Sequence, residues 1–193
     1  MTDSVPFFNG FAVSADLLGV GMKVFGDYGQ YEAALRLNLK DRYFPIFEAG
    51  VGSCDHTNEG TLLHYKTRAP YFRLGVDYNI LKNKHDVYRL YLGARYGFTK
   101  FDYDLSCPDV KDPVWNTMST FEAHDISCHY HWMEVVASVD AMFWGPVHLG
   151  WSVRYRNRLG YDEGSLDRCW YVPGFGTSSK NTFGATFNVI IDI

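Results

Sequence analysis

The amino-acid sequence predicts an all-β fold, a single up-and-down antiparallel β-barrel of about eight strands. Two patterns in the 193-residue chain support this prediction. Apolar and polar residues alternate with a period of two in segment after segment, as in strands with two unlike faces. The connections between these segments are alternately short and long, which is typical of successive hairpins in a barrel. The length suits one domain, which we assign to residues 1–193.

Six segments show the alternation clearly. Over 31–40, every second residue from Tyr31 to Leu39 is apolar, and the residues between them are mostly polar. A helix would mix these two sets, so a strand is the better interpretation. The pattern recurs in 72–80, 90–99, 133–143, 148–159 and 182–193, and weaker strands over 11–17 and 45–53 complete the count.

The connections differ in length in a regular way. We place short turns at 41–42, 82–86 and 145–146, and long connections at 19–29, 54–68, 104–127 and 160–180. Because short and long connections alternate, all short turns fall at one end of the barrel. Outer-membrane barrels have this asymmetry, with short periplasmic turns and longer extracellular loops.

Alternation alone leaves open whether the apolar face is inside, as in a soluble lipocalin-like barrel, or outside. The many large side chains on the apolar face would overfill an eight-stranded barrel. The charged face also holds glycines, which make room for long neighbours inside a narrow barrel: Gly50, Gly52, Gly75, Gly93, Gly97, Gly150 and Gly184. We therefore predict a transmembrane barrel whose apolar belt faces lipid and whose interior is charged.

Aromatic residues make up 17% of the chain, and many lie near the ends of the predicted strands. Such positions are typical of the aromatic girdles at membrane interfaces. We assign to these girdles Tyr43, Phe44, Tyr71, Tyr88, Tyr103, Tyr130, Trp132, Trp144 and Tyr161.

The charged face predicts a network of paired side chains that fills the lumen. Buried charges are tolerated when they are paired and hydrogen-bonded, and the planar guanidinium of arginine suits such networks. The predicted members are Glu32, Arg36, Glu48, Arg73, Asp77, Arg95, Glu134, Asp140, Arg154 and Arg156. Aqueous channels need about 16–18 strands, so an open pore is not expected, although a narrow channel stays an alternative.

Four cysteines lie in the long connections or at their edges: Cys54, Cys107, Cys128 and Cys169. In the predicted topology they share the extracellular end, outside any reducing cytosol. An even number of cysteines there predicts one or two disulfides, and the three possible pairings stay open. No two of them have the close spacing of a zinc site.

Three stretches carry a resemblance to a known family: NLKDRYFP at 38–45, LGWSVRYR at 149–156 and WYVPGFG at 170–176. The chain resembles, over nearly its whole length, an uncharacterised family of outer-membrane β-barrels from Bacteroidota, of the small, OmpA-like size class. The resemblance implies the fold and the cell outer membrane as the location, and it implies no activity. Residues 1–4 lack the basic start and the apolar core of a signal peptide. For a protein at that location, we therefore expect that a signal peptide has been removed.

No catalytic signature identifies an enzyme. His124, Asp125, Ser127 and His129 lie close together in sequence at the outer rim, but no recognised motif surrounds them. An enzyme acting on lipid or peptide at this rim is kept as an alternative. His129 and His131 share one face of a strand, which is a weak signal for metal binding, and we expect no metal and no cofactor.

We expect a structural or accessory component of the cell envelope that acts through its extracellular loops or a partner membrane protein. The expected partners are outer-membrane lipid and another outer-membrane protein or lipoprotein. A net charge of −4 gives no reason to expect nucleic acid. Trp170, Tyr171 and Phe175 of one long connection would either form a contact patch or pack over the barrel mouth.

Overall fold

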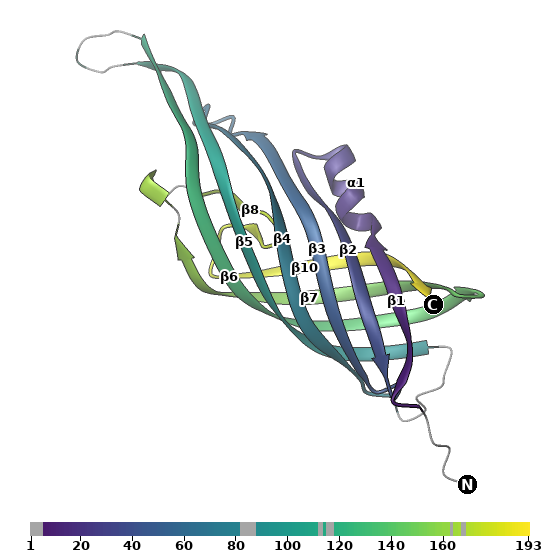
Figure 1. Ribbon diagram of the computed structural model, residues 1–193. Coiled ribbons are helices and arrows are strands. Elements are labelled where there is room, and N and C mark those ends of the chain that lie inside the picture. The colour runs from purple at the N-terminus through teal and green to yellow at the C-terminus, as the bar shows by residue number, and fades with distance from the viewer. Residues whose placement is uncertain (1–5, 82–87, 112–113, 115–117, 163, 167–168) are drawn as a thin grey trace.

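The computed structural model describes residues 6–81, 88–111, 114, 118–162, 164–166 and 169–193, which form a slanted barrel (Figure 1). Its wall consists of β1 (Phe8–Asp16), β2 (Tyr28–Leu39), β3 (Tyr43–Thr57), β4 (His64–Asn79), β5 (Tyr88–Lys111), β6 (Met118–Trp144), β7 (Val147–Asp162) and β10 (Asn181–Asp192). The remaining elements are α1 (Leu17–Phe25), a 3₁₀ turn (Gly164–Leu166) and the small hairpin of β8 (Tyr171–Val172) and β9 (Gly176–Thr177).

The wall closes on itself in the order β1-β10-β7-β6-β5-β4-β3-β2, with every pair antiparallel. The first and last strands complete the circle, with Ala12 opposite Asp192 and Asp16 opposite Asn188. These eight described strands confirm the predicted all-β, up-and-down barrel. Tight turns join β2 to β3 and β6 to β7, and Gly145 in the second turn has a positive φ of 55°. The turn predicted at 82–86 lies outside the described residues.

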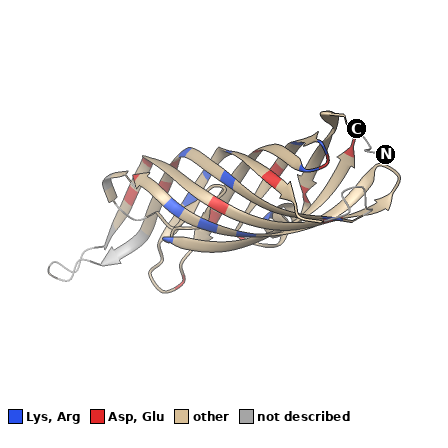
Figure 2. Cartoon of the chain, turned by 90° about the horizontal axis from the view of Figure 1, so that it is seen from below, with Lys and Arg blue, Asp and Glu red and all other residues tan. Residues whose placement is uncertain are grey.

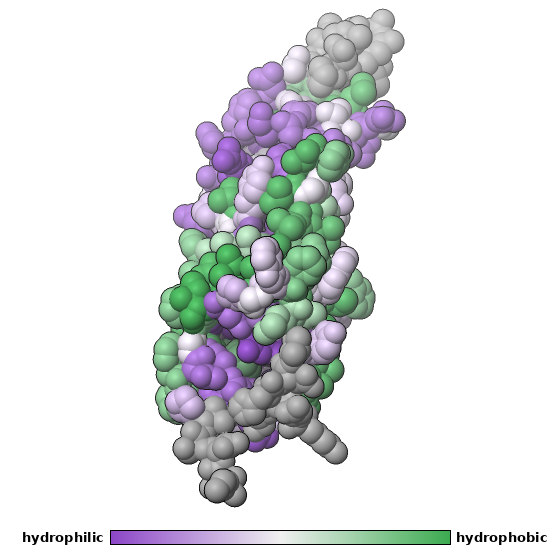
Figure 3. Space-filling model, turned by 90° about the vertical axis from the view of Figure 1, so that its right-hand side faces the viewer, coloured by the Kyte–Doolittle hydropathy of each residue, from purple (hydrophilic) through white to green (hydrophobic). Residues whose placement is uncertain are grey.

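Outward-facing side chains form an apolar belt around the barrel. On β4, Phe72, Leu74 and Val76 are 46%, 61% and 48% exposed. The same face continues toward the opposite end with Lys66 and Arg68, so the belt stops there. Figure 3 shows hydrophobic side chains across the middle of one side and hydrophilic ones at the upper end. A belt of about ten residues per strand matches the length that a tilted strand needs to cross a bilayer.

No helix among the described residues is long and apolar enough to span a bilayer.

The strands extend well beyond the predicted bounds. β5 has 24 residues and β6 has 27, so most of the connection predicted at 104–127 is a continuous hairpin. β3 and β4 likewise enter the connection predicted at 54–68. Above the belt the alternation inverts: Phe101, Tyr103 and Leu105 are buried and the residues between them are polar. This inverted pattern marks a segment whose outer face meets water, and the belt pattern alone missed it.

The connection predicted at 19–29 contains α1, which begins where β1 ends. The carboxylate of Asp16 accepts hydrogen bonds from Leu18 N at 3.0 Å and from Gly19 N at 3.1 Å. These bonds satisfy the first amides of the helix, as an N-cap does. Asp16 Oδ1 also accepts a hydrogen bond from Phe187 N of β10 at 3.2 Å. One buried side chain therefore ends β1, starts α1 and holds both against β10.

The predicted girdle is wrong for more than half of its members. Tyr43, Tyr88, Trp144 and Tyr161 are exposed. The other five are buried inside the barrel: Phe44, Tyr71, Tyr103, Tyr130 and Trp132. The reason is the period of two, because Tyr71 shares a face with Arg73 and Trp132 with Glu134. Four of the five belong to an apolar core in the outer half of the lumen.

Candidate functional site

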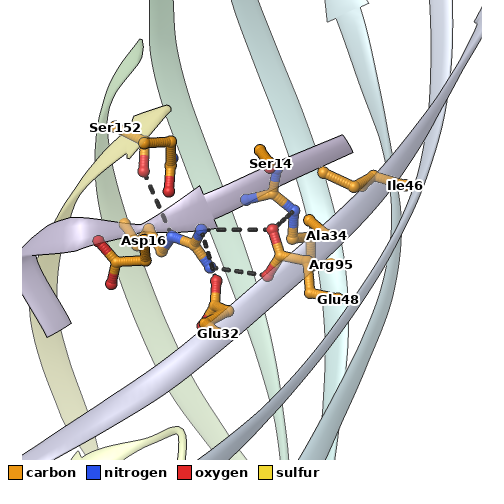
Figure 4. A pocket seen from close by; sticks show the side chains of 10 residues that line it. Ser14, Asp16, Glu32, Ala34, Ile46, Glu48, Arg95 and Ser152 are labelled. Carbon is orange, nitrogen blue, oxygen red and sulfur yellow. Dashed lines mark hydrogen bonds and ion pairs between the residues drawn. The ribbon is translucent and has the colours of Figure 1, made fainter. Parts of the chain in front are cut away.

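The middle of the lumen is organised around Glu48 of β3. Its Oε2 lies 2.8 Å from Arg154 Nη1 and 3.1 Å from Arg73 Nη1. Its Oε1 lies 3.2 Å from Arg95 Nε (Figure 4). All four side chains are buried, so each charge is stabilised by its neighbours and not by bulk water.

Glu32 of β2 forms a second contact point beside the first. Its Oε2 accepts hydrogen bonds from Arg73 Nη1 at 2.5 Å and from the Tyr71 hydroxyl at 2.6 Å. Its Oε1 accepts one from Arg154 Nη2 at 3.2 Å. Glu32 and Glu48 thus share the same two guanidinium groups.

Glu134 of β6 extends the network toward β7. Its Oε1 lies 2.9 Å from Arg73 Nε and 3.3 Å from Arg156 Nε. The same oxygen accepts a hydrogen bond from Trp132 Nε1 at 2.6 Å. The indole therefore joins the charged layer to the aromatic core above it.

Toward the short-turn end, the network continues through Asp77 and Asp140. Arg95 Nη2 donates to Asp77 Oδ2 at 3.0 Å, and Arg36 Nη2 lies 3.5 Å from the same oxygen. Arg36 Nη1 donates to Asp140 Oδ2 at 2.5 Å. The guanidinium of Arg36 also lies over the Tyr91 ring, 4.7 Å from its centroid.

The structure brings all ten sequence-predicted lumen residues into this one connected network. They are five carboxylates and five guanidinium groups, so their formal charges cancel. In Figure 2 acidic and basic positions lie near one another along the strands of the barrel. A neutral network needs no counter-ion in the lumen.

Glycines on the inner face provide the space for this network. A Cβ added at Gly75 would lie 2.5 Å from Arg95 Cγ, and one at Gly184 would lie 2.8 Å from Arg156 Nη2. Larger residues at these positions would therefore displace the guanidinium groups.

The hairpin of β8 and β9 closes the outer mouth, which is one of the two placements that the sequence allows for Tyr171 and Phe175. Tyr171, Val172 and Phe175 are buried in the aromatic core. Two backbone carbonyls between β8 and β9 bind the network from above: Gly174 O accepts from Arg73 Nη2 at 2.6 Å, and Phe175 O from Arg156 Nη1 at 2.9 Å. These residues pack over the barrel mouth, and Trp170 is half-buried against the same core. The feature of the sequence that indicates this hairpin is an apolar segment interrupted by Pro-Gly.

Little space is left around the charged network in the middle of the lumen. A cavity beside Glu48 and Arg95 has a volume of about 10 Å³ (Figure 4), and one near Arg36 and Phe44 has about 80 Å³. The first is close to the smallest volume that holds a single water molecule. Neither has the size of an ordinary substrate pocket.

The predicted disulfides are not formed among the described residues. In the β5–β6 register, Cys107 lies opposite Phe121 and Cys128 lies opposite Phe101. The two cysteines are therefore separated by about 20 Å along the hairpin, too far for a disulfide. Cys54 is buried in the wall, and Cys169 Sγ lies 3.5 Å from the Tyr65 hydroxyl. All four cysteines do lie at the outer end of the barrel, but inside extended strands or under the mouth hairpin.

The histidines at the outer rim lie apart from the network. The rings of His129 and His131 have their centroids 5.6 Å apart, and His129 Nδ1 lies 4.0 Å from Asp162 Oδ2. His131 Nδ1 lies 3.1 Å from the Tyr96 hydroxyl. Within the described residues, no group of three potential metal ligands is assembled.

Residues 2–192 match the model of a family described as a domain of unknown function (DUF6048). The chain belongs to this family. The DUF6048 match covers nearly the whole barrel and brings no activity with it. None of the curated proteins matches the sequence. The origin in Bacteroidota stays a prediction.

The DUF6048 barrel is similar in fold to Neisserial surface protein A, with a TM-score of 0.53 and 12% identity over 96% of this chain and 99% of that one. A major outer membrane protein from Thermus thermophilus matches with a TM-score of 0.49 and 15% identity, over 95% and 98% of the two chains. CarO2 from Acinetobacter baumannii matches with a TM-score of 0.48 and 11% identity, over 97% and 99%. At such low identity the likeness to the neisserial protein establishes the fold alone.

Proposed function

We propose that this protein is an integral β-barrel of the outer membrane that serves the cell envelope as a structural or accessory component, and that it is neither an enzyme nor an open channel. The observation that carries the proposal is an outward apolar belt around a lumen whose middle is filled by a charge-neutral network.

The belt supports the membrane location. Leu74, Val135 and Trp151 lie on different strands and are 61%, 54% and 63% exposed. An apolar surface that surrounds a barrel is unfavourable in water and favourable in hydrocarbon. A closed barrel also satisfies the backbone hydrogen bonds of its strands without water, which a bilayer requires.

The lumen supports a role outside catalysis and conduction. The five carboxylates and five guanidinium groups of its network are paired with one another, and the cavity beside Glu48 and Arg95 has a volume of about 10 Å³. At the rim, His124 Nδ1 lies 3.5 Å from Asp104 and His124 Nε2 lies 3.7 Å from Glu122. No contact among the described residues places the Ser127 hydroxyl beside a histidine base, which a nucleophile would need.

The long hairpin of β5 and β6 supports an accessory role. β4 pairs with β5 as far as His64 opposite Ser106, and β7 pairs with β6 as far as Asp162 opposite His129. Beyond these points the hairpin continues without neighbouring strands, as its projecting end in Figure 1 shows. A projecting hairpin on a rigid barrel offers a contact surface for another outer-membrane protein or lipoprotein.

A photo-crosslinking amino acid at Phe121 tests this role in living cells. Phe121 is 42% exposed on the projecting hairpin, and Leu74 in the belt provides a matched outward-facing control. We expect one protein adduct of constant mass at Phe121 and only lipid adducts at Leu74. Recovery of the Phe121 variant without any protein adduct would overturn the accessory role, while lipid adducts at Leu74 would still support the membrane location.

Planar-bilayer recordings test the closed lumen. We expect no discrete conductance steps from the purified barrel. Reproducible single-channel steps from the wild-type protein, absent from a preparation without it, would favour the narrow channel instead.

A further inference from the structure

The barrel wall is incomplete beside the outer half of β10. β1 pairs with β10 only from Asp192 to Asn188, whereas β10 continues to Asn181 in its pairing with β7. In place of further β1 residues, α1 lies along β2 and β10. A cleft of about 330 Å³ remains between α1 and β10, and it reaches Arg156 and Tyr171 in the interior. Its size falls within the range of small-molecule sites, about 300–1,000 Å³.

The cleft passes through the wall and does not lie on one side of it. Phe183 and Ala185 face outward from β10, whereas Thr182 and Gly184 lie on the inner face, and all four line the cleft. Leu18 and Met22 of α1 form the opposite side of its outer rim. These apolar rim residues are continuous with the lipid-facing belt.

One edge of β10 lacks a strand partner in the cleft. Phe187 N donates to Asp16 Oδ1, and Ile193 N, directly after β10, donates to Phe11 O. Odd-numbered residues along this strand therefore direct their backbone groups toward β1. Phe183 and Ala185 have the same parity and lie beyond the last β1 pair. Their backbone groups therefore face the cleft, where a bilayer would leave them without a hydrogen-bonding partner.

The inner end of the cleft offers a positively charged donor. Arg156 Nη1 donates to Phe175 O and its Nε lies 3.3 Å from Glu134 Oε1. Its Nη2 lies on the Gly184 side that lines the cleft. The other charged group in the cleft is Asp16, whose two oxygens accept three backbone hydrogen bonds.

We propose that this cleft binds a single-chain amphiphile, with the chain between α1 and β10 and a carboxylate or phosphate head at Arg156. The apolar rim would accept the chain from the bilayer, and the head oxygens would accept hydrogen bonds from Arg156 Nη2 and the strand edge. The proposal rests on the membrane location proposed above. The head chemistry is shared by a fatty acid and a lysophospholipid, which the experiment separates.

The test uses the full-length barrel in phosphatidylcholine bilayers with three C16 probes that carry a diazirine in the chain: a fatty acid, a lysophosphatidylglycerol and a fatty alcohol. After photolysis, labelled peptides are mapped by mass spectrometry. We expect label on α1 and on β10 around Phe183, at least fivefold above that on β4–β6, for one or both anionic probes. The fatty alcohol should label these segments several-fold less.

Two variants make the result decisive. Ala185→Trp places an indole at the cleft mouth, whereas Ala137→Trp makes the same change on the outward face of β6. Labelling of α1 and β10 should fall about tenfold in the first variant and stay unchanged in the second.

Labelling spread evenly around the belt, or equal in both variants, would overturn the cleft site while leaving the membrane location intact. Equal labelling by the alcohol would overturn the role of Arg156 in head recognition. A preference for the fatty acid or for the lysolipid would identify the source of the head group. Absence of label from the belt as a whole would overturn the membrane location and this proposal together.

Discussion

Glu48 and Arg154 lie 2.8 Å apart across the lumen, although 106 residues separate them in the chain. Glu48 belongs to β3 and Arg154 to β7, which stand four places apart in a closed ring of eight strands. The contact therefore joins opposite walls of the barrel. It explains how a narrow barrel with a charged interior keeps a fixed cross-section.

Removal of the charge at Glu48 should destabilise the barrel strongly. Glu48→Gln leaves three buried guanidinium groups without their shared carboxylate, and breaking a buried ion pair costs about 3–5 kcal/mol. The measurement is the free energy of unfolding in urea, in lipid bilayers. Glu122→Gln, at an exposed position of the hairpin, is the control and should change it by less than about 0.5 kcal/mol. A loss at Glu48 no larger than that of the control would show that the network contributes little to stability.

The structure also predicts that Asp16 controls α1. Asp16→Ala removes the acceptor for Leu18 N, Gly19 N and Phe187 N, and loss of an N-cap costs about 0.5–2 kcal/mol. Hydrogen exchange of the α1 amides should accelerate about tenfold or more. Asp16→Asn keeps an oxygen that can cap the helix and should have a much smaller effect. Equal exchange in both variants would contradict the capping role.

The mouth hairpin should respond to a side chain at Gly174. This residue has a φ of 79°, and an added Cβ would lie 2.5 Å from the Tyr71 ring. Gly174→Val should displace the hairpin from the lumen and make the bond after Tyr171 accessible to chymotrypsin. Gly60→Val, in an exposed turn, is the matched control and should remain uncleaved at Tyr171. Resistance of the Gly174 variant would show that the hairpin stays in place without that fit.

A charge introduced in the middle of the belt should destabilise the barrel in a lipid bilayer. Val76→Arg lies on the outward face of β4, and an arginine at the midplane of a membrane barrel costs about 2–4 kcal/mol. Ser127→Arg lies above the belt on β6 and should cost about 1 kcal/mol or less. Unfolding titrations in phosphatidylcholine bilayers measure both. A similar cost at the two positions would contradict the predicted depth of the belt.

The cysteines should behave as thiols of unequal reactivity. Cys54 lies above the belt, between the outward-facing Ser53 and Asp55, and burial raises the pKa of its thiol to about 12. At pH 8 such a pKa leaves about one thiolate in 10⁴, so alkylation of the folded protein should be slow. Half-buried Cys107 should react first. In denaturant without reductant, we expect alkylation of all four cysteines, whereas a pair that reacts only after reduction would contradict the structure.

The alternation of faces is a local property, which is why the sequence predicts it well. Glu32 and Arg36 could be assigned to the lumen from their spacing alone, and the same holds for the other eight members of the network. Their individual partners could not be assigned, because contacts such as Glu48 with Arg154 depend on closure of the whole ring. The disulfide prediction failed for the same reason, since it used the order of the cysteines and not the strand register.

Other errors have specific physical causes. The helix α1 has only nine residues and contains Gly19 and Gly21, which disfavour a helix, so the sequence does not distinguish it from a loop. The sequence alone cannot choose between a contact patch and packing over the mouth, because burial of Val172 and Phe175 depends on the aromatic residues that line the barrel. The upper parts of β5 and β6 were missed because their apolar residues turn inward above the belt.

The neutral network also constrains how the barrel can enter a membrane. The β2–β3 hairpin contributes two carboxylates and one guanidinium to the network. The β4–β5 hairpin contributes one carboxylate and two guanidinium groups. Neither hairpin could cross hydrocarbon by itself without taking along an unmatched charge, which is costly. Stepwise insertion of single hairpins is therefore disfavoured, and the sheet must curl with its charged face still hydrated. Contact of β1 with β10 would then be the last event, at which the remaining water leaves the lumen.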